Sequence, residues 1–183
     1  MVSISAKPVG VAAGVLAGLG VAGWLLLARE APPEVDPAAA AAVLPVIDDE
    51  LERGPWAGML SRTRPESGPR WFCAERVIEI RRTRDAVTVG LEATCDEFAR
   101  DGDTLVEGSG ERAPKLVVLA AGSRRVLRVE TAPDGDALAP WVQRHFSAAG
   151  AAELDRRNLA VDPNIAEARR TFGLPPDAPV RPG

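Results

Sequence analysis

The sequence contains no tyrosine, a single histidine, and only four tryptophans and four phenylalanines. Sugar-binding clefts and aromatic cages for cationic ligands usually need more aromatic surface than this, so both kinds of site are disfavoured. With one histidine and two cysteines, the chain also has too few soft ligands for a zinc site. We therefore expect no bound metal ion and no cofactor.

The chain also lacks the short motifs of common enzyme classes. It has no GxSxG nucleophile elbow, no HExxH, no glycine-rich dinucleotide loop after a strand and no GxxxxGK[ST]. Gly108-Ser109-Gly110, followed by Lys115, superficially resembles a phosphate loop, but it lacks the spacing and the following helix, so we interpret it as a hairpin turn. The sequence predicts no catalytic residue.

The single histidine, His145, falls on the apolar stripe of a predicted helix, beside Trp141 and Phe146. A general base also needs a positioned partner, and the sequence does not supply one. The favoured interpretation is a histidine that fills a helix–sheet contact. A secreted enzyme that uses His145 with an aspartate or glutamate is an alternative.

Acidic residues outnumber basic ones after the amino-terminal segment. Lys7 is the only charged side chain before Val9. The rest of the chain therefore carries 21 basic and 26 acidic residues, a net charge of −5. Such a surface repels nucleic acid. Asp101-Gly102-Asp103 and Asp134-Gly135-Asp136 read as turns, and neither matches a complete calcium loop.

The longest apolar segment, Val9–Ala28, is a run of twenty uncharged residues. At about 1.5 Å per helical residue it spans about 30 Å, the thickness of a bilayer's hydrocarbon core. A membrane anchor is favoured over a cleaved signal, because the run exceeds a typical signal core and the only plausible cleavage, after Ala28, places Leu26 where a small residue is needed. If the run is cleaved, the protein is secreted.

The flanking charges predict the orientation of this segment. Lys7 and the terminal amine lie on the short side, whereas Glu30, Glu34 and Asp36 follow the run. Positive charge stays in the cytoplasm, so we expect the amino terminus inside the cytoplasmic membrane and residues 29–183 outside. Gly10, Gly14 and Gly18 share one helix face and are candidates for weak self-association in the membrane.

The sequence of the exported part, residues 29–183, predicts an α+β domain with four to five antiparallel strands between helices. Residues 29–36 form a tether, and a helix begins at Asp36-Pro37, with Pro45 inside it. Residues 54–70 read as a loop. Alternation of apolar and polar residues predicts strands over 71–82, 85–98, 104–109, 114–121 and 124–131, although the third and fourth could be one bent strand.

Helical spacing returns over residues 138–156, and a last short helix opens at Asp162-Pro163 and closes at Gly173. The tail, PPDAPVRPG, is predicted to be disordered. The predicted organisation is a cytoplasmic end and membrane helix over 1–28, the tether, a domain over 37–157, and the short helix and tail over 158–183.

Cys73 and Cys95 are predicted to form a disulfide. An even cysteine count outside the cytoplasm favours one bond. If 71–82 and 86–98 form a hairpin, residues whose numbers sum to 168 face each other, and this places Cys73 opposite Cys95. The same register puts Ile78 and Ile80 on the face opposite Val87 and Val89, so either both sheet faces are covered or a bulge shifts one strand.

Several segments carry a resemblance: WFCAERVIEIRR, LEATCDEF, APWVQRHFSAAGAAE and EARRTFGLPPDAPVR, in a lysine-poor chain rich in Ala, Arg, Gly and Pro. Together with the apolar run they resemble small exported proteins of high-GC actinobacteria. The resemblance implies a location outside the membrane and no activity. The element order is also similar to cystatin/NTF2-like rolls, in which a helix packs on a curved antiparallel sheet.

These features favour a non-enzymatic, membrane-anchored domain that binds another envelope protein or serves as an accessory subunit. A module that holds a small apolar molecule or a lipid on its curved sheet is the second interpretation.

Overall fold

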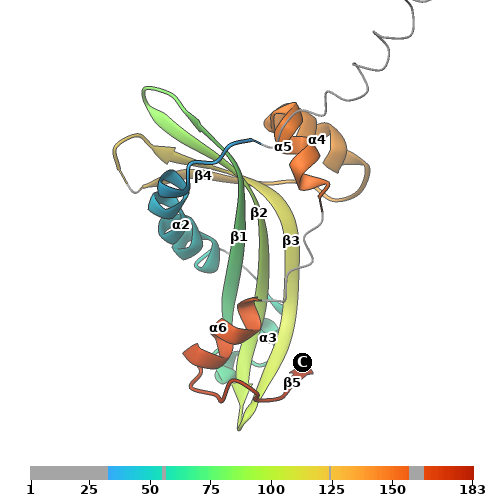
Figure 1. Ribbon diagram of the computed structural model, residues 1–183. Helices are drawn as coiled ribbons and strands as arrows, with labels where there is room; N and C mark the ends of the chain where they lie inside the picture. Colours follow the sequence, from blue (N-terminus) through green and yellow to red (C-terminus); the bar gives the residue numbers. More distant parts are fainter. Residues whose placement is uncertain (1–32, 55–56, 124, 157–162) are drawn as a thin grey trace, which may run out of the picture. The chain divides into compact units, whose positions relative to one another are not determined.

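The computed structural model describes residues 33–54, 57–123, 125–156 and 163–183. Within the compact unit Pro32–Gly183, these residues form an α+β fold with a mixed five-stranded sheet (Figure 1). The apolar run Val9–Ala28, with Gly10, Gly14 and Gly18, lies outside the described residues. In the part of the chain that is described, no helix is long and apolar enough to cross a membrane.

The first described helix, α2 (Pro37–Glu52), begins as its sequence predicts. Asp36 is the N-cap, and its side chain accepts the N–H of Ala38 at 2.9 Å. Pro45 is accommodated inside the helix. Ile47 and Leu51 are buried, so α2 packs one apolar face on the sheet.

Four strands follow one another as neighbours in the sheet: β1 (Arg70–Arg82), β2 (Ala86–Asp101), β3 (Thr104–Ala120) and β4 (Val126–Thr131). All three pairings between them are antiparallel. β3 is a single long, bent strand (Figure 1), so the alternative of one bent strand over 104–121 is confirmed. Gly108-Ser109-Gly110 therefore lies inside a strand, and the interpretation of a hairpin turn is wrong.

The β1–β2 register matches the sequence prediction at the cysteines. Cys73 lies opposite Cys95, and the pairing keeps this register as far as Val77. A bulge then shifts the strand, so that Ile80 pairs with Val89 and packs in the same cluster, whereas Ile78 packs on the other side of the sheet. The two explanations left open for the isoleucines therefore hold together: a bulge is present and both faces are covered.

The alternation of side chains along β2 shows which helices cover which face of the sheet. Leu91 and Cys95 point to α2, and Ala99 packs with Leu60 of α3 (Met59–Thr63). The side chains of Asp96 and Phe98 point to the opposite face of the sheet, where they contact α6 (Pro163–Thr171). The face of β2 that carries Asp96 and Phe98 also bears the groove described below.

Two predicted segments are more finely divided in the structure. The predicted loop 54–70 contains α3 and a short 3₁₀ turn, η1 (Pro65–Ser67). The predicted helix 138–156 is two helices, α4 (Leu138–His145) and α5 (Ala148–Leu154), preceded by η2 (Gly135–Ala137). The break falls at Ser147, because its side chain accepts the N–H of Gly150 and starts a new helix.

The carboxyl-terminal tail is ordered, which corrects the prediction of a disordered end. Its last residues form β5 (Val180–Pro182), which pairs in parallel with β3 and makes the sheet mixed. The guanidinium of Arg169 donates to the carbonyls of Pro176 and Ala178 and holds the tail against α6. Leu174 and Ala178 are buried, so apolar contact and carbonyl hydrogen bonds outweigh the polar, proline-rich composition.

Candidate binding groove

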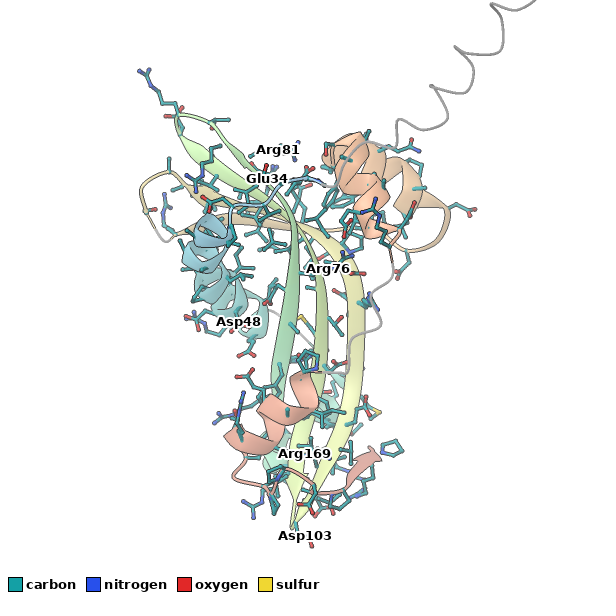
Figure 2. All side chains as sticks on the ribbon, viewed as in Figure 1. Glu34, Asp48, Arg76, Arg81, Asp103 and Arg169 are labelled. Carbon is teal, nitrogen blue, oxygen red and sulfur yellow. A yellow bond between two sulfur atoms is a disulfide. The ribbon has the colours of Figure 1, made fainter. Side chains whose placement is uncertain are left out.

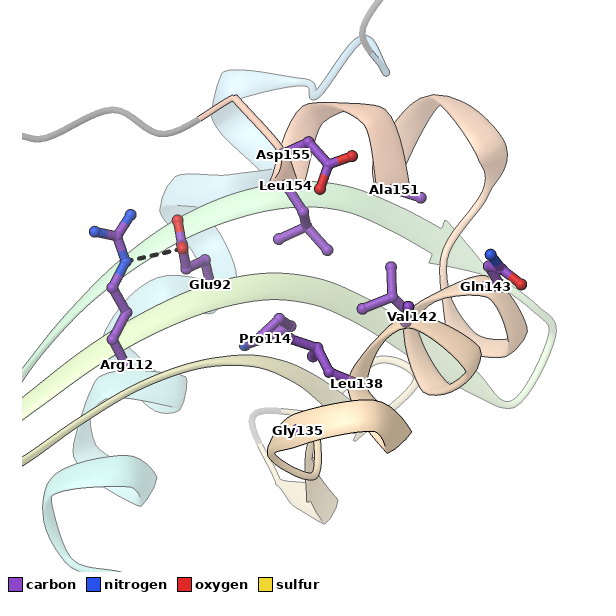
Figure 3. A pocket seen from close by; sticks show the side chains of 11 residues that line it. Glu92, Arg112, Pro114, Gly135, Leu138, Val142, Gln143, Ala151, Leu154 and Asp155 are labelled. Atoms are coloured by element: carbon purple, nitrogen blue, oxygen red, sulfur yellow. Dashed lines mark hydrogen bonds and ion pairs between the residues drawn. The ribbon is translucent and has the colours of Figure 1, made fainter.

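A groove lies between the β2–β3 face and the helices α4 and α5. Its volume is about 770 Å³. Figure 3 shows the side chains of Val142 and Leu154 pointing into the same space above Pro114 of β3. Among the described residues, Leu138 is one of two large apolar side chains that are exposed, at 37%. The lining residues are Glu92, Arg112, Pro114, Gly135, Leu138, Ala139, Val142, Gln143, Ala151, Leu154 and Asp155.

A network of charged side chains lies at one end of this groove, where Glu92 and Arg112 line it (Figure 3). Glu92 accepts from Arg112 at 2.9 Å and from Arg76 at 3.1 Å. Figure 3 shows the Glu92–Arg112 pair. Arg76, labelled in Figure 2, reaches from β1 to Glu153 of α5 at 2.9 Å. These pairs hold α5 on the sheet and leave the guanidinium of Arg112 at the groove's edge, with 39% of its side chain exposed.

The charge of Glu92 follows from these contacts. Burial alone raises the pKa of a carboxyl group, but hydrogen bonds from Arg112 and Arg76 outweigh burial and lower the pKa of Glu92. The groove thus combines an apolar wall with a fixed pair of opposite charges at one end.

His145 does not line this groove. Its ring stacks on Trp141 with centroids 4.3 Å apart, and Nδ1 lies 2.8 Å from the Trp141 carbonyl oxygen. Nε2 lies 3.5 Å from a carboxylate oxygen of Glu130. Both ring nitrogens thus face groups of the protein at a helix–sheet contact, as the favoured interpretation of His145 expects.

The predicted disulfide is present. Cys73 and Cys95 are bonded, with Cα atoms 4.1 Å apart, and both side chains are buried in the cluster under α2. They lie on the opposite face of β2 from the groove, where they clamp β1 to β2.

The predicted turns coincide with reversals of the chain, where Gly102 and Gly135 adopt positive φ, at 63° and 66°. Asp101 ends β2 and Asp136 lies in η2, and none of the four aspartates lines the groove. Among the described residues, no group of three or more His, Cys, Asp or Glu side chains is placed to hold a metal ion.

Sequence reasoning missed a buried carboxylate, Glu97, that positions α3. Glu97 is 0% exposed, and it accepts the N–H groups of Leu60 (2.9 Å), Ser61 (2.7 Å) and Ser109 (3.4 Å) as well as the hydroxyl of Ser61. A Cβ at Gly108 would lie 2.5 Å from its Oε2, so the glycine makes room for it. The signal in the sequence is an acidic residue in the apolar phase of β2, shared with Leu91 and Cys95.

Glu79 has the same role at α5. It is 5% exposed, and it accepts the backbone N–H and the hydroxyl of Ser147, at 3.1 and 2.6 Å. A Cβ at Gly150 would lie 2.5 Å from its carboxylate. Two buried glutamates therefore dock two short helices on the sheet, and the Glu79 contact fixes one wall of the groove.

Comparisons of the chain with protein-family models, with curated proteins and with solved structures found no match.

Proposed function

We propose that this chain is a non-enzymatic protein-interaction module, and that the groove between the sheet and α4–α5 binds a segment of a partner protein. The exposed Leu138, with Val142 and Leu154 beside it, carries this proposal. Apolar side chains that stay in contact with water lower the free energy when a partner covers them.

The charges around the groove indicate what kind of segment fits. Arg112 and Glu92 at one end and Asp155 among the lining residues supply both signs of charge around an apolar wall. An amphipathic helix or an extended segment, with apolar side chains inward and charges at its ends, complements this arrangement. The groove is not an enclosed cavity, which suits a segment of a larger protein better than a fully enclosed ligand.

Photocrosslinking in the native membrane tests this proposal. A photoreactive residue in place of Gln143 is expected to capture one protein of defined mass, and the same residue in place of exposed Glu66 is not. L138D should abolish the adduct, because a carboxylate placed in the apolar wall opposes burial. L127D is the matched control, since Leu127 is also a large apolar residue, is 46% exposed and does not line the groove.

A small apolar molecule or a lipid is the second candidate ligand, because about 770 Å³ falls within the range of small-molecule sites. In that case the photoreactive residue would label a lipid or no macromolecule. Native mass spectrometry of the full chain would then show a co-purified mass that L138D removes and L127D retains. That result would replace the protein-interaction proposal.

We propose further that the domain works outside the cytoplasmic membrane, anchored by Val9–Ala28. The buried Cys73–Cys95 bond supports this location, because structural disulfides persist in oxidising compartments. A reporter that is active only outside the cytoplasm, fused after Gly183, should work, and carbonate-washed membranes should retain the full-length mass. Two alkylatable thiols in protein purified without reductant would contradict the export.

A further inference from the structure

Among the described strands, β1, β4 and the three-residue β5 are outer strands, and the two longer ones are protected differently. β1 is contacted by α2, α5 and α6, and the carboxylate of Glu52 accepts the N–H of Cys73 at its edge, at 3.3 Å. The bulge next to Ile78 further interrupts β1. Contacts, side-chain caps and bulges of this kind block the pairing of an edge strand with another chain.

β4, which lies beside β3, has less of this protection, although its pairing shifts as well: Arg128 pairs with Val118 and Val126 with Leu119, so Leu127 forms a bulge. Within the described residues β4 pairs only with β3; α2 packs against it, and His145 of α4 lies 3.5 Å from its Glu130. β4 contains neither lysine nor proline, and its Leu127 is 46% exposed. An exposed edge with an apolar side chain favours strand addition.

The backbone of β4 presents hydrogen-bonding groups outward at alternate residues. Ala132 donates its N–H to Pro114 of β3 at 2.9 Å, and β3 partners Glu130 with Leu116 and Arg128 with Val118. Because the direction of the backbone groups alternates along an antiparallel strand, those of Val129 point away from β3.

We propose that β4 pairs with β4 of a second copy of this chain, antiparallel about a two-fold axis at Val129. This register places Arg128 opposite Glu130 of the second copy, and Glu130 opposite its Arg128. The proposal does not depend on the groove.

Charge self-complementarity is what selects a second copy as the occupant. Arg128 and Glu130 lie on one face of β4, where they form an ion pair at 2.9 Å with 61% and 29% of their side chains exposed. In the paired strands the same four side chains alternate in sign, and directly opposed opposite charges favour an antiparallel pair. One titratable group of α4 also lies near these charges: Nε2 of His145 is 3.5 Å from a carboxylate oxygen of Glu130.

A contact built on one six-residue strand is small, so we expect a weak dimer that forms with rising protein concentration. Sedimentation of the full chain in detergent micelles measures it directly. R128E and E130R each place two pairs of like charges across the axis and should weaken dimerisation about tenfold or more. The double variant R128E/E130R restores opposite charges and should restore the dimer.

Fold controls keep this test interpretable. Arg128 and Glu130 form an exposed ion pair, which contributes little to stability, so each variant should keep the wild-type circular dichroism. If R128E fails to fold, L127D provides a second disruption of the edge, and L138D in the groove is its matched control. A wild-type chain that stays monomeric up to its solubility limit, or a dimer that R128E and E130R leave unchanged, overturns the proposal.

Discussion

Glu97 and Glu75 lie on neighbouring strands of one sheet, yet their carboxyl groups respond to burial in opposite ways. Glu97 on β2 is 0% exposed, and its pKa is lowered. Glu75 on β1 is less buried, and its pKa is raised to about 7. If burial alone decided the charge state, the order of the two pKa values would be reversed.

The difference lies in the groups that face each carboxylate. Burial would raise the pKa of Glu97, but hydrogen bonds from Ser61, Leu60 and Ser109 outweigh it. Glu75 has no such set of donors: its Oε1 is buried without a hydrogen-bond partner among the described residues. Burial raises its pKa first, and the carboxylates of Asp48, Glu52 and Glu167 raise it further.

This comparison separates a structural anchor from a pH-sensitive position. The charge of Glu97 is stabilised by donors of α3, so its removal should loosen that helix. The charge of Glu75 is opposed by the carboxylates of α2 and α6 (Asp48 is labelled on α2 in Figure 2), so its removal should stabilise the fold.

The largest expected effect is that of E97Q. The amide cannot accept all the hydrogen bonds of the carboxylate, and its NH₂ group faces backbone donors. We expect a loss of about 3 kcal/mol in the free energy of unfolding, measured by urea titration of the full chain. The control is E107Q, an exposed glutamate on β3, which should change stability by less than about 0.5 kcal/mol. Equal effects of E97Q and E107Q would refute the anchor.

G108A should cost less, about 2 kcal/mol, by crowding the same carboxylate. A Cβ there would lie 2.5 Å from Oε2 of Glu97 and 2.8 Å from Cγ of Leu60. A double-mutant cycle with E97A tests the cause, because a shortened side chain relieves the clash. The cost of G108A should then fall by half or more, whereas strict additivity would mean that Glu97 is not the obstacle.

S61A should cost about 1.5 kcal/mol, because it removes one hydroxyl donor to a charged acceptor and leaves the backbone donors in place. S67A is the matched control. The hydroxyl of Ser67 also forms a hydrogen bond, but to the carbonyl of Arg64 at the exposed surface. A loss in S61A no larger than in S67A would show that the backbone N–H groups hold Glu97 by themselves.

The order and pairing of the main strands could be predicted from the sequence, because alternation and the cysteine pair define them locally. Val87, Val89 and Leu91 set the phase of β2, and the Cys73–Cys95 pair set the register with β1. The sequence indicates the bulge after Val77 only as one of two explanations, because the bulge depends on which helix covers Ile78.

The groove and the two glutamate anchors could not be predicted, because they depend on contacts between distant segments. Glu97 accepts a hydrogen bond from Ser61, which is 36 residues away in the sequence, and Glu79 accepts one from Ser147, which is 68 residues away. The tail was missed for the same reason: its composition is typical of disorder, but Arg169 and the edge of β3 hold it. Local patterns carry no information about such partners.

The smallest and opposite effect is that of E75Q, which should stabilise the protein near neutral pH. The pKa of Glu75 in the folded chain is about 7, above the ordinary value of 4.5. The folded state therefore holds a proton that the unfolded chain has already released, and stability falls as the pH rises between these two values. The pKa values of Asp48 and Glu52 are raised as well, chiefly by burial, and act with the same sign.

A glutamine at this position mimics the protonated acid at every pH. After allowance for screening by solvent at this partly exposed site, we expect E75Q to add about 0.5–1 kcal/mol at pH 8 and almost nothing at pH 4.5. Urea titrations of wild type, E75Q and E107Q across this range measure the difference. E107Q should follow the wild-type curve. If E75Q also follows the wild-type curve, Glu75 releases its proton at the ordinary pH. The two glutamates would then differ only in how deeply they are buried.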